Sequence, residues 1–203
     1  MKSSRIILGF IVIGIGVSFF YLFNGGEGQA YIDEIIRERK DKDDFMRNSD
    51  ASPFRAKKDS CTPLKYFAPD MKYRLQASLN YIQAREMLTL STNDSKSQSY
   101  LAYAWAEFDL DNLHNKLLIL EIAEGEENGK LFLAFADQTS ANETYGAGRY
   151  LDVKKVPGAN SISLDFNKAY NPYCAYTDSY SCPLPPKENL LKVSILAGEK
   201  TYH

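Results

Sequence analysis

The residues best suited to chemistry are concentrated between Asp137 and Asn189. This stretch interleaves carboxylates, asparagines, tyrosines and an arginine, and such loops can hold a ligand between ring faces while polar groups orient it. The alternative is that these side chains hydrogen-bond the backbone of long loops that lack sheet partners. The candidate ligand-binding residues are Asp137, Thr139, Glu143, Tyr145, Arg149, Tyr150, Asp165, Asn167, Tyr170 and Asn171.

Three kinds of function could use these residues. In a binding module, the Asp137–Cys182 loops would bind a small ligand or a peptide, with the tyrosines as stacking surfaces and Arg149 paired with an anionic group. In a hydrolytic or isomerising enzyme, carboxylates would act as acid and base in the manner of a glycosidase, although the sequence does not define their separation. In a structural or assembly component, the loops would only brace the fold. The carboxylates considered for the enzyme are Asp137, Glu143 and Asp165.

Cys174 and Cys182 lie eight residues apart in a segment that contains four prolines. Outside the cytoplasm, a disulfide between them would hold this proline-rich loop against the sheet. Two unmodified thiols are the alternative. Metal binding is disfavoured, because no histidine is nearby and the spacing differs from that of zinc knuckles. We therefore predict neither a metal nor a cofactor, and we expect Cys61 to be buried or free.

Composition excludes several other classes of protein. The formal net charge is −2, so electrostatic capture of nucleic acid has no support. The chain has only two histidines, which disfavours a Ser-His-Asp or Cys-His hydrolase. The segment Gly146–Arg149 is similar to a phosphate-binding loop, but a strand follows it where such loops need a helix, so we interpret it as a turn.

An apolar segment near the N-terminus predicts a membrane anchor. Residues 6–23 carry no charge, and as a helix they would span roughly 27 Å, close to the ~30 Å hydrocarbon core of a bilayer. Lys2 and Arg5 precede the segment, which favours a cytoplasmic tail and a domain outside the cytoplasm. In a bacterium this means the periplasm or the outer face of the membrane. The alternative is a signal peptide that is cleaved near Ala30 and releases a secreted protein.

The chain after the anchor (residues 1–23) divides into three parts. Residues 24–30 are a Gly-rich spacer, residues 31–60 a charged helix and linker, and residues 61–203 a β domain. The helix is predicted over residues 31–48, and Ser52-Pro53 ends it. From Leu64 onward the hydrophobic period is two. The runs LLILEIA and LFLAFA are apolar at nearly every position, which predicts strands that are covered on both faces. About eight short strands joined by compact turns predict a mainly-β antiparallel sandwich or small barrel. The predicted strands are 73–80, 86–90, 100–110, 116–123, 130–136, 148–153, 161–165 and 191–197.

Three longer strings carry a resemblance to a known family. ETYGAGRYLDV, LDFNKAYNPYCAY and CPLPPKENLLKVSILAGEK resemble the hallmarks of an uncharacterised bacterial family, domain-of-unknown-function family 1684. The resemblance runs from the charged helix to Lys200, which is nearly everything after the anchor. Ala141 and Tyr173 stand at loop positions where the family pattern has Gly and Pro. Members have no established activity, so the resemblance implies no catalytic residue.

Overall fold

The computed structural model describes residues 27–56 and 61–203, so the predicted anchor over residues 6–23 lies outside the described residues. In the part of the chain that is described, no helix combines the length and the apolar character needed to cross a membrane. The chain divides into two compact units, Met1–Lys40 and Asp41–His203.

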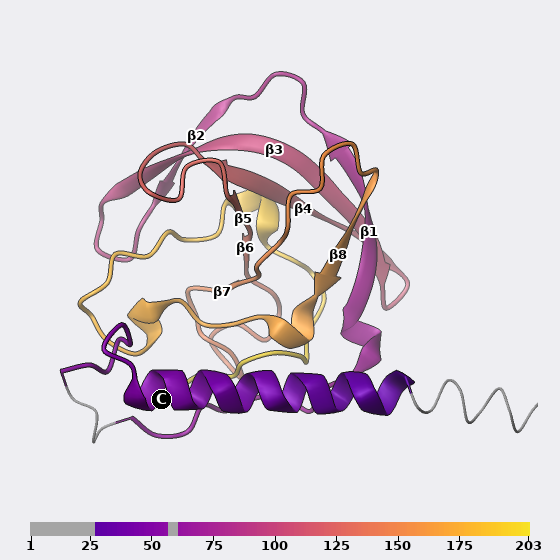
Figure 1. Ribbon diagram of the computed structural model, residues 1–203. Helices are drawn as coiled ribbons and strands as arrows, with labels where there is room; N and C mark the ends of the chain where they lie inside the picture. Colours follow the sequence, from indigo (N-terminus) through magenta and orange to yellow (C-terminus); the bar gives the residue numbers. More distant parts are fainter. Residues whose placement is uncertain (1–26, 57–60) are drawn as a thin grey trace, which may run out of the picture. The chain divides into compact units, whose positions relative to one another are not determined.

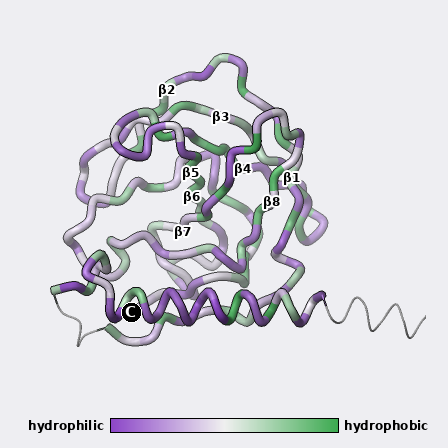
Figure 2. The backbone as a smooth tube through the Cα atoms, viewed as in Figure 1, coloured by the Kyte–Doolittle hydropathy of each residue, from purple (hydrophilic) through white to green (hydrophobic). Residues whose placement is uncertain are grey.

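A helix occupies residues 27–48 and includes the whole of the predicted segment 31–48. Figure 2 shows that this helix is mostly hydrophilic, with short apolar bands, as expected when charged side chains alternate in sign along an exposed face. The chain then turns at Ser52, whose hydroxyl donates to the carbonyl of Met46 and accepts the N–H of Phe54 at 3.0 Å. These two bonds satisfy a carbonyl at the end of the helix and end it before Pro53.

The Asp41–His203 unit is mainly β and antiparallel, as predicted. Its larger sheet has six strands in the order β5-β4-β3-β1-β8, with β2 pairing β3 beside this path, and a second sheet pairs β6 with β7. The choice between a sandwich and a small barrel stays a prediction. The strands are β1 (Arg74–Tyr81), β2 (Met87–Ser91), β3 (Ser97–Leu110), β4 (Leu113–Ile122), β5 (Leu131–Phe132), β6 (Ala134–Phe135), β7 (Arg149–Tyr150) and β8 (Ser161–Asp165). Short 3-10 helices are η2 (Met71–Tyr73), η3 (Phe166–Lys168), η4 (Tyr173–Ala175) and η5 (Lys187–Asn189).

The longest strand, β3, organises the larger sheet. One edge of β3 pairs with β4 along most of its length, whereas the other edge is shared between β2 and β1. The register of β3 against β4 shifts between Ala102 and Ala104, an irregularity of the kind that bends a strand. Figure 1 shows β3 arching, with β2 near one end and β1 near the other. The bend separates the part of β3 that carries Tyr100 from the part that pairs with β1.

The apolar run in β4 is covered on both faces, as predicted. Leu117 and Ile119 belong to the main core, which also contains residues of β1, β3 and β8. Leu118 and Leu120 point to the opposite face and form a second cluster with Tyr100 of β3. Because successive side chains of a strand alternate between faces, a run that is apolar at every position is expected only where both faces are buried.

Three predicted strands differ from the structure. The segment 130–136 is split at Leu133 into β5 and β6, and the segment 148–153 is a strand only at Arg149–Tyr150. The segment 191–197 is irregular, so its prediction as a strand was wrong. Its carbonyls at Ile195 and Ala197 accept hydrogen bonds from the side chain of Arg149 instead of from a neighbouring strand. The alternating apolar side chains are still buried, which explains why the pattern was misleading.

Candidate functional site

Arg149 and Asp137, both predicted ligand-binding residues, form an ion pair inside the protein. Nη2 of Arg149 lies 2.8 Å from Oδ2 of Asp137, and each side chain is 1% exposed. The same guanidinium donates to the backbone carbonyls of Ile195, Ala197 and Glu199. Burial lowers the pKa of Arg149, and the adjacent Asp137 carboxylate opposes this effect. The Nη atoms are therefore committed to the protein's own backbone and to Asp137.

The turn before Arg149 explains how this side chain reaches the interior. Gly148 has a φ of +88°, and a Cβ atom at this position would lie 2.6 Å from the carbonyl oxygen of Phe135 and 2.5 Å from Pro185. Only glycine fits this close approach. The interpretation of Gly146–Arg149 as a turn agrees with the structure, in which the turn leads into the short strand β7.

Asn171 belongs to a second buried group, which is centred on Glu199. Asn171 donates to Glu199 from its side-chain amide at 2.9 Å and from its backbone N–H at 3.2 Å. The other donors to this carboxylate are the hydroxyl of Tyr176 and Nζ of Lys42, which lies 3.0 Å away. Each oxygen of Glu199 thus accepts two hydrogen bonds, and the residue is fully buried. Sequence reasoning missed Glu199, because a single glutamate near the C-terminus has no local pattern that indicates burial.

Asp165 and Asn167 connect β8 to the segment before β1. Oδ1 of Asp165 accepts the backbone N–H of Asn167 at 3.2 Å and so caps η3. The amide of Asn167 bonds both backbone groups of Asp70, at 2.9 Å and 2.7 Å. Thr139 bonds Asp137 through its N–H and its hydroxyl, while Glu143 is exposed. These contacts match the alternative in which polar side chains hold long loops together.

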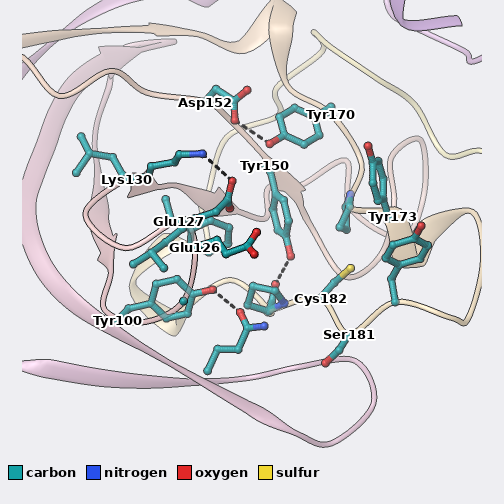
Figure 3. A pocket seen from close by; sticks show the side chains of 18 of the residues that line it. Tyr100, Glu126, Glu127, Lys130, Tyr150, Asp152, Tyr170, Tyr173, Ser181 and Cys182 are labelled. Atoms are coloured by element: carbon teal, nitrogen blue, oxygen red, sulfur yellow. Dashed lines mark hydrogen bonds and ion pairs between the residues drawn. The ribbon is translucent and has the colours of Figure 1, made fainter. Parts of the chain in front are cut away.

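A cleft of about 1350 Å³ lies elsewhere in the Asp41–His203 unit. We call it the tyrosine cleft, after the five tyrosines that line it, four of which are labelled in Figure 3. Of the ten predicted ligand-binding residues, only Tyr150 and Tyr170 line it. The sequence did not indicate Tyr100 or the turn between β4 and β5, because both are distant from the predicted loops along the chain. The five tyrosines are Tyr100, Tyr150, Tyr170, Tyr173 and Tyr180.

The rings on one wall of the cleft form a continuous row. Tyr100 stacks on Phe132 with ring centroids 5.0 Å apart, and Phe132 meets Tyr150 edge to face at 5.0 Å. Tyr150 in turn meets Tyr170 edge to face at 6.0 Å. These rings come from β3, β5, β7 and the segment after η3, so only the tertiary structure assembles the row.

The hydroxyl groups in this row are bonded within the protein. Tyr100 donates to Gln98 at 2.8 Å, Tyr150 donates to the carbonyl of Pro183 at 2.7 Å, and Tyr170 donates to Asp152 at 2.8 Å. Burial raises the pKa of Tyr100 to about 12, and burial likewise raises the pKa of Tyr150 and of Tyr170. All three rings are therefore held as neutral phenols near neutral pH.

Charged side chains also line the cleft. Figure 3 shows the carboxylate of Glu126, from the turn between β4 and β5, pointing toward the ring of Tyr150, whereas the carboxylate of Glu127 points to Lys130. Lys130 lies 2.9 Å from Glu127, and Lys155 lies 2.7 Å from Glu121. Three lysines thus line the cleft, counting Lys42, and each is paired with a carboxylate.

One of the two predicted disulfide partners lines the cleft. Cys174 and Cys182 are free, buried thiols, and Cys182 lines the cleft. The N–H of Cys174 donates to Sγ of Cys182 at 3.3 Å. The thiol of Cys174, followed by nearby backbone N–H groups, stabilises the thiolate of Cys182 and lowers its pKa to about 7 despite burial. Within the described residues, no cluster of three potential metal ligands occurs.

Comparison with known proteins shows relatives without an assigned function. The family model "Protein of unknown function (DUF1684)" matches residues 60–200. Among solved structures, the chain is similar to the solution NMR structure of an uncharacterized protein from gene locus rrnAC0354 of Haloarcula marismortui. The two are 34% identical with a TM-score of 0.66, and the match covers 88% of this chain and 99% of that one. No curated protein matches the chain.

Proposed function

The chain belongs to the DUF1684 family of proteins of unknown function, and we propose that it is a binding module whose small ligand lies in the tyrosine cleft. The observation that carries this proposal is the row of rings from Tyr100 through Tyr150 to Tyr170. Each tyrosine ring of this row is held by the backbone at one end and by the hydrogen bond of its hydroxyl at the other. Such rings provide a large contact surface at little cost in side-chain entropy. A purely structural aromatic cluster has no need to line an open cleft.

The proposal keeps part of the predicted Asp137–Cys182 region and changes the role of the rest. Tyr150, Tyr170 and Cys182 contribute to the cleft. Arg149 is not assigned to an anionic group of the ligand, because its Nη atoms already bond Asp137 and three carbonyls. Nor do Asp137, Glu143 and Asp165 line the cleft, so no observation favours them as an acid and a base.

The membrane anchor over residues 6–23 stays part of the proposal. An uncleaved anchor would keep the cleft near a membrane surface, on the outer side if the basic N-terminal tail stays in the cytoplasm. The proposed place of action is therefore the cell envelope, and the proposed ligand is one that is present there.

Saturation-transfer difference NMR on the purified full chain tests the binding function. A library of small aromatic and amine fragments should yield hits whose signal falls when Tyr150 is changed to Leu. The matched control is Tyr81→Leu, since Tyr81 is exposed and does not line the cleft. Circular dichroism of both variants checks that the fold is kept. A library with no hits, or hits that persist equally in both variants, would contradict the proposal.

A further inference from the structure

We propose that the ligand of the tyrosine cleft is a small organic cation, whose alkylated ammonium group lies against tyrosine faces with Glu126 as its counter-charge. This inference rests on the binding function proposed above and specifies the chemical class of the ligand. It differs from the expectation of an anionic group paired with Arg149.

The geometry of the rings suits a cation. Tyr150 is inclined by 75° to Phe132 and by 82° to Tyr170, so the row contains two corners of nearly perpendicular rings. The face of an aromatic ring carries partial negative charge, and an ammonium group within about 6 Å of the centroid is attracted to it. An edge-to-face contact covers one face of one of the two rings, so a cation would use a ring face that remains open to the cleft.

The cleft already holds one ammonium group in this way. Nζ of Lys42 lies 4.7 Å from the centroid of the Tyr170 ring. The same nitrogen lies 3.0 Å from a carboxylate oxygen of Glu199. A tyrosine face and a carboxylate together therefore stabilise an alkylammonium at the wall of the cleft. The proposed ligand would repeat this arrangement with Tyr150 and Glu126.

The charges of the lining residues favour a cation over an anion. Four carboxylates line the cleft against three lysines, and Lys42 and Lys155 pair with carboxylates that do not line it. Only Lys130 remains to balance the acidic side chains, and it pairs with Glu127. Among the described residues, Glu124 and Glu126 form no ion pair. The four carboxylates are Glu124, Glu126, Glu127 and Asp152.

The same features disfavour a metal ion as the occupant. Hard cations such as Ca²⁺ and Mg²⁺ require six or more oxygen ligands, including water, at short distances. Although four carboxylates line the tyrosine cleft, no three acidic, histidine or cysteine side chains of the described residues are grouped so that they could hold a metal ion. What the wall presents is ring faces, and these attract a soft, poorly hydrated cation such as an alkylated ammonium more strongly than a hydrated metal ion.

Isothermal titration calorimetry on the full chain tests the inference with cationic and neutral probes of the same shape. The cations are tetramethylammonium, choline and benzyltrimethylammonium, and the neutral isostere of choline is 3,3-dimethyl-1-butanol. We expect at least one cation to bind, and we expect choline to bind at least about fivefold more tightly than its isostere. Equal affinity for choline and the isostere, or no binding by any of the three cations, would overturn the cation inference.

Four variants distinguish ring face, hydroxyl and charge. Tyr150→Phe keeps the face and should retain cation binding, whereas Tyr150→Leu should abolish it. Glu126→Gln should weaken binding about fivefold, while Glu86→Gln, an exposed change outside the cleft, should have no effect. Unchanged affinity in Glu126→Gln would show that Glu126 is not the counter-charge of the ligand. If neutral fragments still bind at Tyr150 when no cation does, the binding function stands and only the ligand class fails.

Discussion

The buried ion-pair network and the tyrosine cleft use the same residue types in opposite ways. In the network, Arg149, Asp137 and Glu199 direct their charges to partners within the protein, and each is almost completely buried. In the cleft, Tyr150 and Tyr170 bond their hydroxyls internally but remain only half-buried, so their rings help to line an open space. The comparison shows that a polar residue in a loop indicates ligand binding only when its hydrogen bonds and ion pairs leave part of its side chain free to contact a ligand.

Breaking the network should have the largest effect on stability. Asp137→Ala leaves the buried guanidinium of Arg149 without its carboxylate, and we expect the free energy of unfolding to fall by about 3–5 kcal/mol. Urea denaturation followed by circular dichroism measures this change. Lys192→Ala, at an exposed position, is the control and should change stability by less than about 0.5 kcal/mol. A loss below about 1 kcal/mol in Asp137→Ala would show that the pair does not hold the 191–199 segment.

Removing one tyrosine hydroxyl from each region compares the network and the cleft directly. Tyr176→Phe removes a buried donor to the carboxylate of Glu199, and we expect a loss of about 1.5–3 kcal/mol. Tyr170→Phe removes a donor to the exposed Asp152, and we expect a loss of about 0.5 kcal/mol, with the ring face kept. Urea denaturation of both variants gives the two values. Equal losses would mean that the cleft wall depends on its hydroxyls as much as the network does.

Titration of Cys182 should have the smallest effect on the fold and the sharpest pH dependence. The neighbouring Cys174 thiol lowers the pKa of Cys182 to about 7, so the thiolate fraction of Cys182 should rise as the pH is raised through the neutral range. Thiolate absorbance near 240 nm, followed in Cys61→Ala protein, should show this transition. Cys174→Ala removes the neighbouring thiol that stabilises the thiolate, so the midpoint should rise.

The same protein provides a test of the predicted disulfide. Intact mass spectrometry without reduction, on protein isolated from the cell envelope, distinguishes a Cys174–Cys182 bridge from two thiols. A bridge would lower the mass by about 2 Da and abolish the thiolate transition. Two alkylatable thiols would reject the disulfide and leave the titration as predicted.

Much of the fold could be predicted because strand patterns are local. Alternating side chains identified the regions of β1, β3 and β8, and the continuous apolar run identified β4 as a strand covered on both faces. The error at 191–197 arose because the side chain of Arg149, more than forty residues earlier, bonds the carbonyls of Ile195 and Ala197, which in a strand would bond a neighbouring strand. A periodic pattern reports that side chains are buried, but not which groups satisfy the backbone.

The candidate site was less accessible to sequence reasoning. The high content of tyrosine and carboxylate in the Asp137–Asn189 stretch pointed to Tyr150 and Tyr170, but it grouped them with Arg149 and Asp165, which contact other residues. Composition along one segment does not distinguish a side chain that faces a cleft from one that faces the interior.

The sequence by itself determined the family, the mainly antiparallel β class and the helix that precedes it, since motifs, alternation and turn residues act over a few positions. Only the tertiary structure decided that Tyr100, Phe132, Tyr150 and Tyr170 form one row and that Arg149 serves the interior. The bend in β3 and the close turn at Gly148 bring these distant segments together. The physical reason is that burial and hydrogen bonding depend on neighbours in space, and it is the folded chain that selects them.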